Sequence, residues 1–104
     1  MGKIRWSKTA QQNIEEIADY IAQDSPFYAI NFVERILQDI EKLSIFPKIG
    51  RIVPEFKKEN IREIIFHNYR IVYKTEKDCV FIVSICHGSI DILRKATSEY
   101  WEIN

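Results

Sequence analysis

Residues 61–87 read IREIIFHNYRIVYKTEKDCVFIVSICH, and this stretch decides the fold. Three runs in it are rich in β-branched and aromatic residues: Ile61–Phe66, Tyr69–Lys74 and Cys79–His87. Polar residues separate these runs, first the pair His67-Asn68 and then the cluster 75–78. The pattern predicts three consecutive antiparallel strands, joined by a two-residue turn and a four-residue loop.

The two connections set the predicted pairing. A two-residue turn places Ile65 opposite Arg70, and a four-residue loop then places Arg70 opposite Val83. Because side chains alternate along a strand, they separate onto two faces. One face is predicted to be core: Ile64, Phe66, Tyr69, Ile71, Tyr73, Val80, Ile82 and Cys86. The other is predicted to be an amphipathic surface with Arg70 near its middle: Glu63, Arg70, Lys74, Phe81, Val83 and His87.

The segments on either side predict helices and a further strand. Ile4–Trp6 is a short strand candidate, and Ser7 is a plausible N-cap. An apolar stripe with helical spacing follows: Ala10, Ile14, Ile17, Ala18 and Ile21. Ser25-Pro26 starts a second helix, with the stripe Ala29, Val33, Ile36, Leu37, Ile40 and Leu43. The short link predicts an antiparallel helical hairpin that packs on the apolar face of the sheet, an α+β fold.

Two less regular segments complete the chain. Residues 47–60 form a long connection, which in small domains is often functional. In the tail after His87, Leu93, Ala96 and Tyr100 could line one side of a short helix. Tyr100 and Trp101 are candidates to dock on the body of the domain.

Length and composition limit the class of protein. A chain of 104 residues is predicted to be one domain, residues 1–104, and 46% apolar content is too high for a disordered chain. Fifteen basic residues balance fifteen acidic ones, which argues against a general nucleic-acid coat. The charges are nevertheless divided. Residues 10–46 hold seven acidic and two basic residues, whereas residues 48–74 hold seven basic and three acidic residues.

The cysteines and the N-terminus indicate the compartment. Cys79 and Cys86 lie roughly 20 Å apart on one extended strand and cannot pair with each other. Unpaired cysteines without a Cys/His ligand cluster predict a reducing compartment and no structural metal. We also expect no cofactor. The N-terminus has no apolar signal-peptide region, and no apolar run reaches membrane-spanning length. We therefore expect a cytoplasmic protein with no membrane partner.

Taken in order, the segments resemble the RelE/ParE superfamily of toxins from type II toxin–antitoxin systems. Four segments carry the resemblance: IRWSKTAQQNIEEIADYIA, FVERILQDIEKLSIFPKIGRIVPEF, NIREIIFHNYRIVYK and VFIVSICHG. The string FPKIGRIVPE, followed by IREI and NYRIVY, is similar to the ParE-like branch, often called plasmid-stabilisation proteins. The resemblance implies one of two activities. RelE-like members are ribosome-dependent messenger-RNA endoribonucleases (mRNA interferases), and ParE-like members poison DNA gyrase without a known catalytic act.

For the ribonuclease branch, the resemblance implies a metal-independent site made of Arg70, Glu55 and His87. Arg70 in NYRIVY matches an arginine at the scissile phosphate, a role that its fixed fork of donors suits. Glu55 in VPE lies where some nucleases have a carboxylate proposed as general base. His87 is near the position of a general acid.

Several features of the chain favour the ParE-like interpretation instead. Residues 88–91 contain no cation, unlike the RelE-like nucleases, and Arg62 falls on the Tyr73 side of the predicted sheet. Arg70 could simply pair with Glu63 or with a carboxylate of a partner, and His87 could hydrogen-bond a loop.

The resemblance therefore implies a ParE-like toxin that inhibits gyrase by protein contact and is neutralised in a complex with a cognate antitoxin. The alternatives are a RelE-like ribonuclease acting on the ribosome and messenger RNA, or a non-toxic homologue that binds only its antitoxin. The predicted contact residues for the antitoxin or the target are Glu63, Arg70, Lys74, Phe81, Val83, Arg51 and Arg62.

Overall fold

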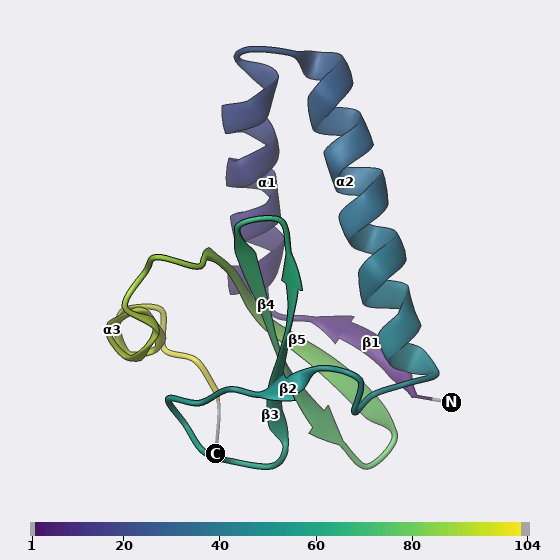
Figure 1. The fold of residues 1–104 in the computed structure, drawn as a ribbon, viewed down its shortest axis with the longest axis vertical. Coiled ribbons are helices and arrows are strands. Elements are labelled where there is room, and N and C mark those ends of the chain that lie inside the picture. Colours follow the sequence, from purple (N-terminus) through teal and green to yellow (C-terminus); the bar gives the residue numbers. More distant parts are fainter. Residues whose placement is uncertain (1, 103–104) are drawn as a thin grey trace.

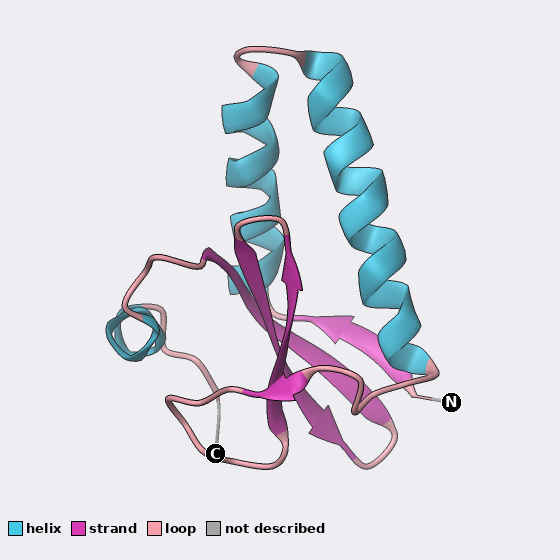
Figure 2. Cartoon of the chain, viewed as in Figure 1, coloured by secondary structure: helices cyan, strands magenta, loops and turns pink. Residues whose placement is uncertain are grey.

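The computed structural model describes residues 2–102 as a helical hairpin standing on one five-stranded sheet (Figure 1). The elements in chain order are β1 (Lys3–Trp6), α1 (Lys8–Ala22), α2 (Pro26–Glu41), the 3-10 turn η1 (Lys42–Ser44), β2 (Arg51–Ile52), β3 (Ile61–Phe66), β4 (Tyr69–Glu76), β5 (Cys79–His87) and α3 (Ile92–Ser98). The strand order is β1-β5-β4-β3-β2, with β1 parallel to β5 and the other neighbours antiparallel. The predicted α+β class and helical hairpin are confirmed. Figure 2 distinguishes the helices from the strands of the sheet by colour.

Both helices begin where the sequence predicts. The Ala10 backbone N–H donates to the Ser7 hydroxyl at 2.9 Å, and the Tyr28 N–H donates to the Ser25 hydroxyl at 3.1 Å. Pro26 occupies the first turn of α2, where its missing N–H removes no helical hydrogen bond. These caps satisfy amide donors that a helix start otherwise leaves without a partner.

A hydrophobic core fills the space between the helices and the sheet. Its buried members are Ala10, Ile36, Ile40, Leu43, Phe66, Ile71, Tyr73, Val80, Ile82 and Ile85. The predicted core face is thus confirmed apart from Cys86, which belongs to a second cluster. Ile17 and Phe32 are the residues nearest the hairpin tip that still pack against this core, and beyond them the hairpin extends past the sheet (Figure 1).

The register of β3 and β4 is as predicted, whereas that of β4 and β5 is not. Ile65 pairs with Arg70, but Arg70 pairs with Cys86 rather than Val83. The predicted four-residue loop is wrong because the strands continue until Glu76 pairs with Cys79, leaving two turn residues. A β-bulge then adds one residue to β5 opposite the Val72–Tyr73 step. This extra residue moves Cys86 off the helix side of the sheet.

The second face of the sheet is buried, so the predicted amphipathic surface is wrong. A second cluster covers it: Val53, Ile61, Val72, Val83, Cys86, Ile92, Ala96 and Trp101. The covering residues come from the connection after β2 and from the segment around α3, which lies beside the sheet away from α2 (Figure 1). Trp101 docks as expected, but Tyr100 is exposed rather than packed. Within residues 2–102, no helix is long and apolar enough to cross a membrane.

Candidate functional site

The buried second face holds a chain of four alternating charges centred on Arg70. Arg70 Nε donates to Glu63 Oε1 at 2.5 Å, and its Nη1 and Nη2 donate to the two oxygens of Glu55 at 3.0 and 2.8 Å. Arg51 Nε donates to the other Glu63 oxygen at 2.6 Å. The order is therefore Arg51–Glu63–Arg70–Glu55, with two positive and two negative groups. We call these four residues the charge quartet.

The inner pair of the quartet is Glu63 and Arg70. Because both side chains are buried, each needs the other to balance its charge. The Glu63 side chain has 0% exposure and that of Arg70 has 9%, whereas Glu55 and Arg51 reach solvent. The hydrogen bonds from Arg70 hold the pKa of Glu55 below its ordinary value. The hydrogen bonds to Glu55, and then those to Glu63, raise the pKa of Arg70 despite the opposing effect of burial. Glu55 and Arg70 therefore both stay charged at neutral pH.

This geometry suits a structural ion-pair network, which we call the clamp, better than an anion-binding site. Each of the three guanidinium nitrogens of Arg70 already faces a carboxylate oxygen. A phosphate could bind the fork only by displacing Glu55, and Glu55 as a base would have to leave its arginine. The clamp fastens the connection after β2 to the middle of the sheet.

His87 lies on the other side of the sheet from Arg70, so their predicted common face is wrong. It pairs with Tyr69 across β4 and β5, with 5.7 Å between the ring centroids, and Tyr69 contacts Phe32 of α2. The imidazole Nδ1 lies 2.7 Å from the Ser89 hydroxyl. The bulge in β5 causes this placement because it reverses the alternation of the side chains that follow. Glu55 and Arg70 are thus joined directly, whereas His87 faces the opposite side of the sheet and shares with Arg70 an edge pocket near Asn68 and Ser89.

The other predicted contact residues have local partners. Arg62 lies opposite Tyr73 and donates to the Gly50 carbonyl at 2.9 Å and to Glu59 at 3.1 Å. The Lys74 ammonium lies 5.6 Å from the centroid of the Phe81 ring, a cation–π contact. Phe81 and Val83 line a groove of about 370 Å³ together with Trp6, Tyr100 and Trp101. Val83 is buried and Phe81 is half-buried, so Phe81 offers more of its side chain to a partner.

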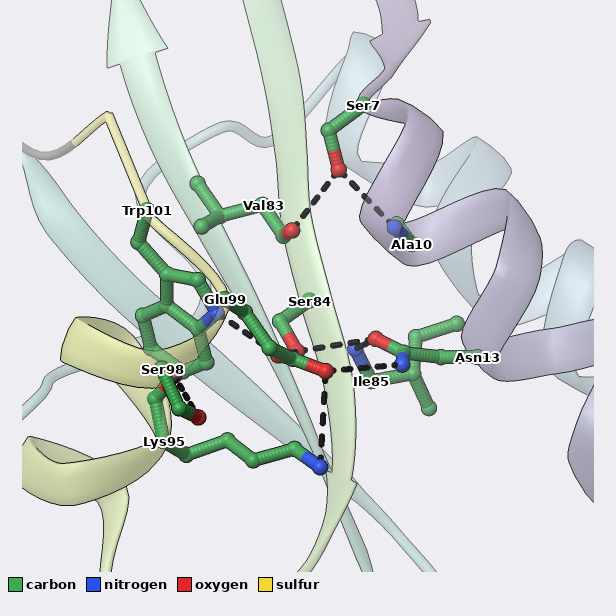
Figure 3. A network of polar contacts seen from close by, with 10 residues as sticks. All are labelled: Ser7, Ala10, Asn13, Val83, Ser84, Ile85, Lys95, Ser98, Glu99 and Trp101. Atoms are coloured by element: carbon green, nitrogen blue, oxygen red, sulfur yellow. Dashed lines mark hydrogen bonds and ion pairs between the residues drawn. The ribbon is translucent and has the colours of Figure 1, made fainter.

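A second polar network, which the sequence did not reveal, joins α1, β5 and the segment after α3 (Figure 3). The Asn13 carbonyl oxygen accepts from the Ser84 hydroxyl at 2.9 Å and from the Ile85 backbone N–H at 3.0 Å. The Asn13 amide donates to Glu99 at 3.3 Å, and Glu99 also accepts from the Trp101 indole at 2.8 Å. Asn13 thus links the hairpin to the segment that covers the second face.

The network lies beside the bulge in β5. There α1 and its cap supply partners for two backbone groups of β5, the Val83 carbonyl and the Ile85 N–H, because backbone polar groups in the interior require hydrogen bonds. The Ser7 hydroxyl donates to the Val83 carbonyl at 2.8 Å, and Asn13 accepts from Ile85. The sequence does carry a signal, since Asn13 interrupts the apolar face of α1 one turn after Ala10. A polar residue on a buried stripe indicates a buried hydrogen-bond partner.

Replacing Asn13 with alanine should lower the free energy of unfolding by about 1–2 kcal/mol, because it leaves the buried Ile85 N–H unpaired. It should also speed hydrogen exchange around α3, because Glu99 loses one of its partners. Denaturant unfolding and amide exchange measure the two effects. Gln12→Ala, at an exposed position on the same helix, is the matched control. Equal exchange rates in the two variants would show that Asn13 does not anchor this segment.

Other groups in residues 2–102 offer little chemistry. Burial raises the pKa of the Cys86 thiol to about 11, so it stays protonated and unreactive at neutral pH. Among the described residues, no group of three or more His, Cys, Asp or Glu side chains is placed to hold a metal ion.

Comparisons with known proteins find a matching family, a similar relative and a similar fold. The model of the family described as "ParE toxin of type II toxin-antitoxin system, parDE" matches residues 4–92. A relative from Sinorhizobium fredii (strain NBRC 101917 / NGR234), described as "Putative toxin Y4kP", is 31% identical over 88 residues, which cover 83% of this chain and 88% of that protein. A solved structure described as "Chromosomal ParDE TA system from P. aeruginosa" is similar in fold. Its TM-score is 0.70 at 18% identity, covering 84% of this chain and 96% of that one.

Proposed function

This chain belongs to the ParE toxin family of type II toxin–antitoxin systems, and from that premise we propose that it inhibits DNA gyrase by direct protein contact. We propose further that a cognate antitoxin neutralises it by binding. On this proposal the chain carries no catalytic centre, and its toxicity depends on the surface that it presents to gyrase.

The hydrogen bonding of Arg70 is the observation on which the choice between gyrase and messenger RNA as the target depends. Metal-free RNA cleavage needs a general base, a cation at the phosphate and a general acid within reach of one bond. Here Arg70 is held by Glu55 and Glu63, and His87 lies across the sheet. The arginine is therefore occupied by the carboxylate that would have to act as the base, and His87 is hydrogen-bonded to Ser89 on the opposite side of the sheet. This arrangement supports a toxin that acts by binding.

The groove beside Phe81 is the proposed binding site for the antitoxin. Its walls include the aromatic rings of Trp6, Phe81 and Trp101, and its rim carries Lys8 and Glu102. An aromatic groove with charged groups at its edge suits an amphipathic peptide segment, whose apolar side chains would enter while its charges meet the rim. Phe81 and Val83 would then contact the antitoxin, whereas Glu63 and Arg70, which are buried, would have a structural role.

Production of this chain alone in bacteria should stop DNA synthesis before it slows protein synthesis. The reason is that gyrase acts on DNA directly, whereas loss of new proteins follows later. Incorporation of labelled DNA and protein precursors after induction measures the order of the two events. The purified chain should also inhibit supercoiling of relaxed plasmid by purified gyrase. Co-production of the cognate antitoxin is the control, and it should restore both activities.

An early fall in protein synthesis with spared DNA synthesis would contradict the proposal. It would direct attention back to Arg70, Glu55 and His87. A folded chain that affects neither process would instead indicate a homologue that binds its antitoxin without being toxic.

A further inference from the structure

The free end of the helical hairpin carries large apolar side chains in solvent. Tyr20, Phe27, Tyr28 and Ile30 have exposures of 69, 81, 67 and 62%. All four lie beyond Ile17 and Phe32, the residues nearest the tip that pack against the core. We call residues 18–31 the hairpin tip, and Figure 1 shows it projecting beyond the sheet.

The internal packing of the hairpin does not require these side chains. Ala29 is the buried residue in this part of α2, so the helix contact is made by a small side chain rather than by its aromatic neighbours. Phe27 and Ile30 are one turn apart and therefore share a side of α2. Four exposed large apolar residues within 11 positions exceed the scattered single ones that are normal on protein surfaces. Such a grouping is typical of a protein interface.

The charges around the tip indicate what kind of surface it meets. Residues 15–35 carry five carboxylates, Glu15, Glu16, Asp19, Asp24 and Glu34, against one cation, Arg35, a balance of 1 − 5 = −4. None of these carboxylates forms an ion pair with another described residue. The charge quartet, by contrast, is neutral and closed on itself. The tip therefore combines exposed aromatic side chains with two carboxylates, Asp19 and Asp24, and no cation. The adjoining turns of α1 and α2 add Glu15, Glu16 and Glu34 against Arg35.

We propose that the hairpin tip is the surface that docks on gyrase, at a cationic surface that the enzyme uses to hold DNA. An enzyme that holds DNA must offer lysine and arginine side chains to its phosphates. Carboxylates on α1 and α2 complement such a surface, and the aromatic side chains add the apolar anchors that interfaces need. This inference rests on the gyrase proposal above.

The chain contains a second exposed apolar group, which serves as an internal comparison. Ile45, Phe46 and Ile49 are 58, 58 and 60% exposed in the connection after η1, at the opposite end of the hairpin. Lys48 lies among them, so this group lacks the negative charge of the tip. Substitutions that remove similar apolar surface at each end can therefore distinguish a docking role of the tip from a general effect of lowering the hydrophobicity of the protein.

The test compares Phe27→Ser/Tyr28→Ser with Phe46→Ser/Ile49→Ser in supercoiling assays with purified gyrase. The tip variant should need at least about tenfold more protein for half-inhibition, as expected when two interface anchors are lost, and the control variant should match the wild type. Glu15→Gln/Asp19→Asn should weaken inhibition less and reduce its dependence on salt, because screening acts on the charges that were removed. Every variant should still bind the antitoxin as the wild type does. This binding also serves as the control that each variant is folded.

The outcomes separate this inference from the proposal on which it rests. If the wild type inhibits gyrase and the tip variant inhibits it equally well, the docking surface is wrong and the function stands. If the wild type does not inhibit gyrase, both are overturned. Loss of antitoxin capture by the tip variant, with gyrase inhibition retained, would assign the tip to the antitoxin and overturn the inference.

Discussion

Replacing Arg70 with alanine should lower the free energy of unfolding by about 3–5 kcal/mol, the largest effect that we expect from a single polar substitution in this chain. Arg70 is the cation that faces Glu63 from β4, and the Glu63 side chain has 0% exposed surface. Without Arg70, a buried carboxylate keeps only Arg51, which lies at the solvent edge. Glu55 loses both of its hydrogen bonds to the guanidinium at the same time. Urea unfolding, compared at equal slope, measures the loss.

The double variant Glu63→Leu/Arg70→Met is the matched control for this prediction. It removes both members of the inner pair and leaves apolar side chains of similar size among Val72 and Val83. Because the cost comes from leaving one charge buried alone, the double variant should recover much of the stability that Arg70→Ala loses. A loss of less than about 1 kcal/mol in Arg70→Ala would mean that the quartet contributes no more than a surface ion pair.

Replacing Gly50 with alanine should cost about 3 kcal/mol of folding stability, the upper end of the range for overpacking a buried site. A β-carbon at this position would lie 2.5 Å from the Glu63 carbonyl oxygen and 2.6 Å from the Tyr73 hydroxyl. The carbonyl belongs to the sheet backbone and cannot move aside cheaply. The hydroxyl is held as well, since it accepts from the Gly50 N–H at 3.0 Å and donates to the Pro47 carbonyl at 2.8 Å. Overpacking against backbone, with loss of these buried hydrogen bonds, accounts for the expected loss, which thermal or urea unfolding measures.

Gly2→Ala provides the control, because a β-carbon there would meet its nearest neighbour at 3.6 Å, an ordinary contact distance. A second comparison uses Tyr73→Phe, which removes the hydroxyl that the β-carbon added at position 50 would strike. The two substitutions should therefore be non-additive, with Tyr73→Phe costing less in the Gly50→Ala background than alone. Additive losses would indicate that the Glu63 carbonyl alone causes the clash.

The two polar networks have a common consequence for function. The charge quartet fastens the connection after β2 to the sheet, and Asn13 fastens the segment after α3 to the hairpin. Both covering segments are therefore held over the second face, and the one after α3 also lines the groove beside Phe81. The hairpin tip has no such covering segment within residues 2–102. A body with one projecting, acidic and aromatic end suits the proposed action by binding.

Much of this protein could be predicted from its sequence, because the signals involved are local. Ser7 and Ser25 cap their own helices, the spacing of apolar residues in residues 10–43 marks the faces that are buried, and a two-residue turn at His67-Asn68 sets the register of β3 against β4. The order of the segments was enough to indicate the family. The contact between Glu63 and Arg70 could also be predicted, since both lie on one hairpin.

Only the tertiary structure decided which side of the sheet each later residue faces. The bulge in β5 lies beside hydrogen-bond partners from more than 70 positions away, Ser7 for Val83 and Asn13 for Ile85. That one added residue separates His87 from Arg70 and sends Cys86 to the second cluster. The second face is buried because segments distant in the chain cover it, and Glu55 reaches Arg70 for the same reason. A local pattern predicts alternation along a strand, but it contains no information about a partner that arrives from elsewhere in the chain.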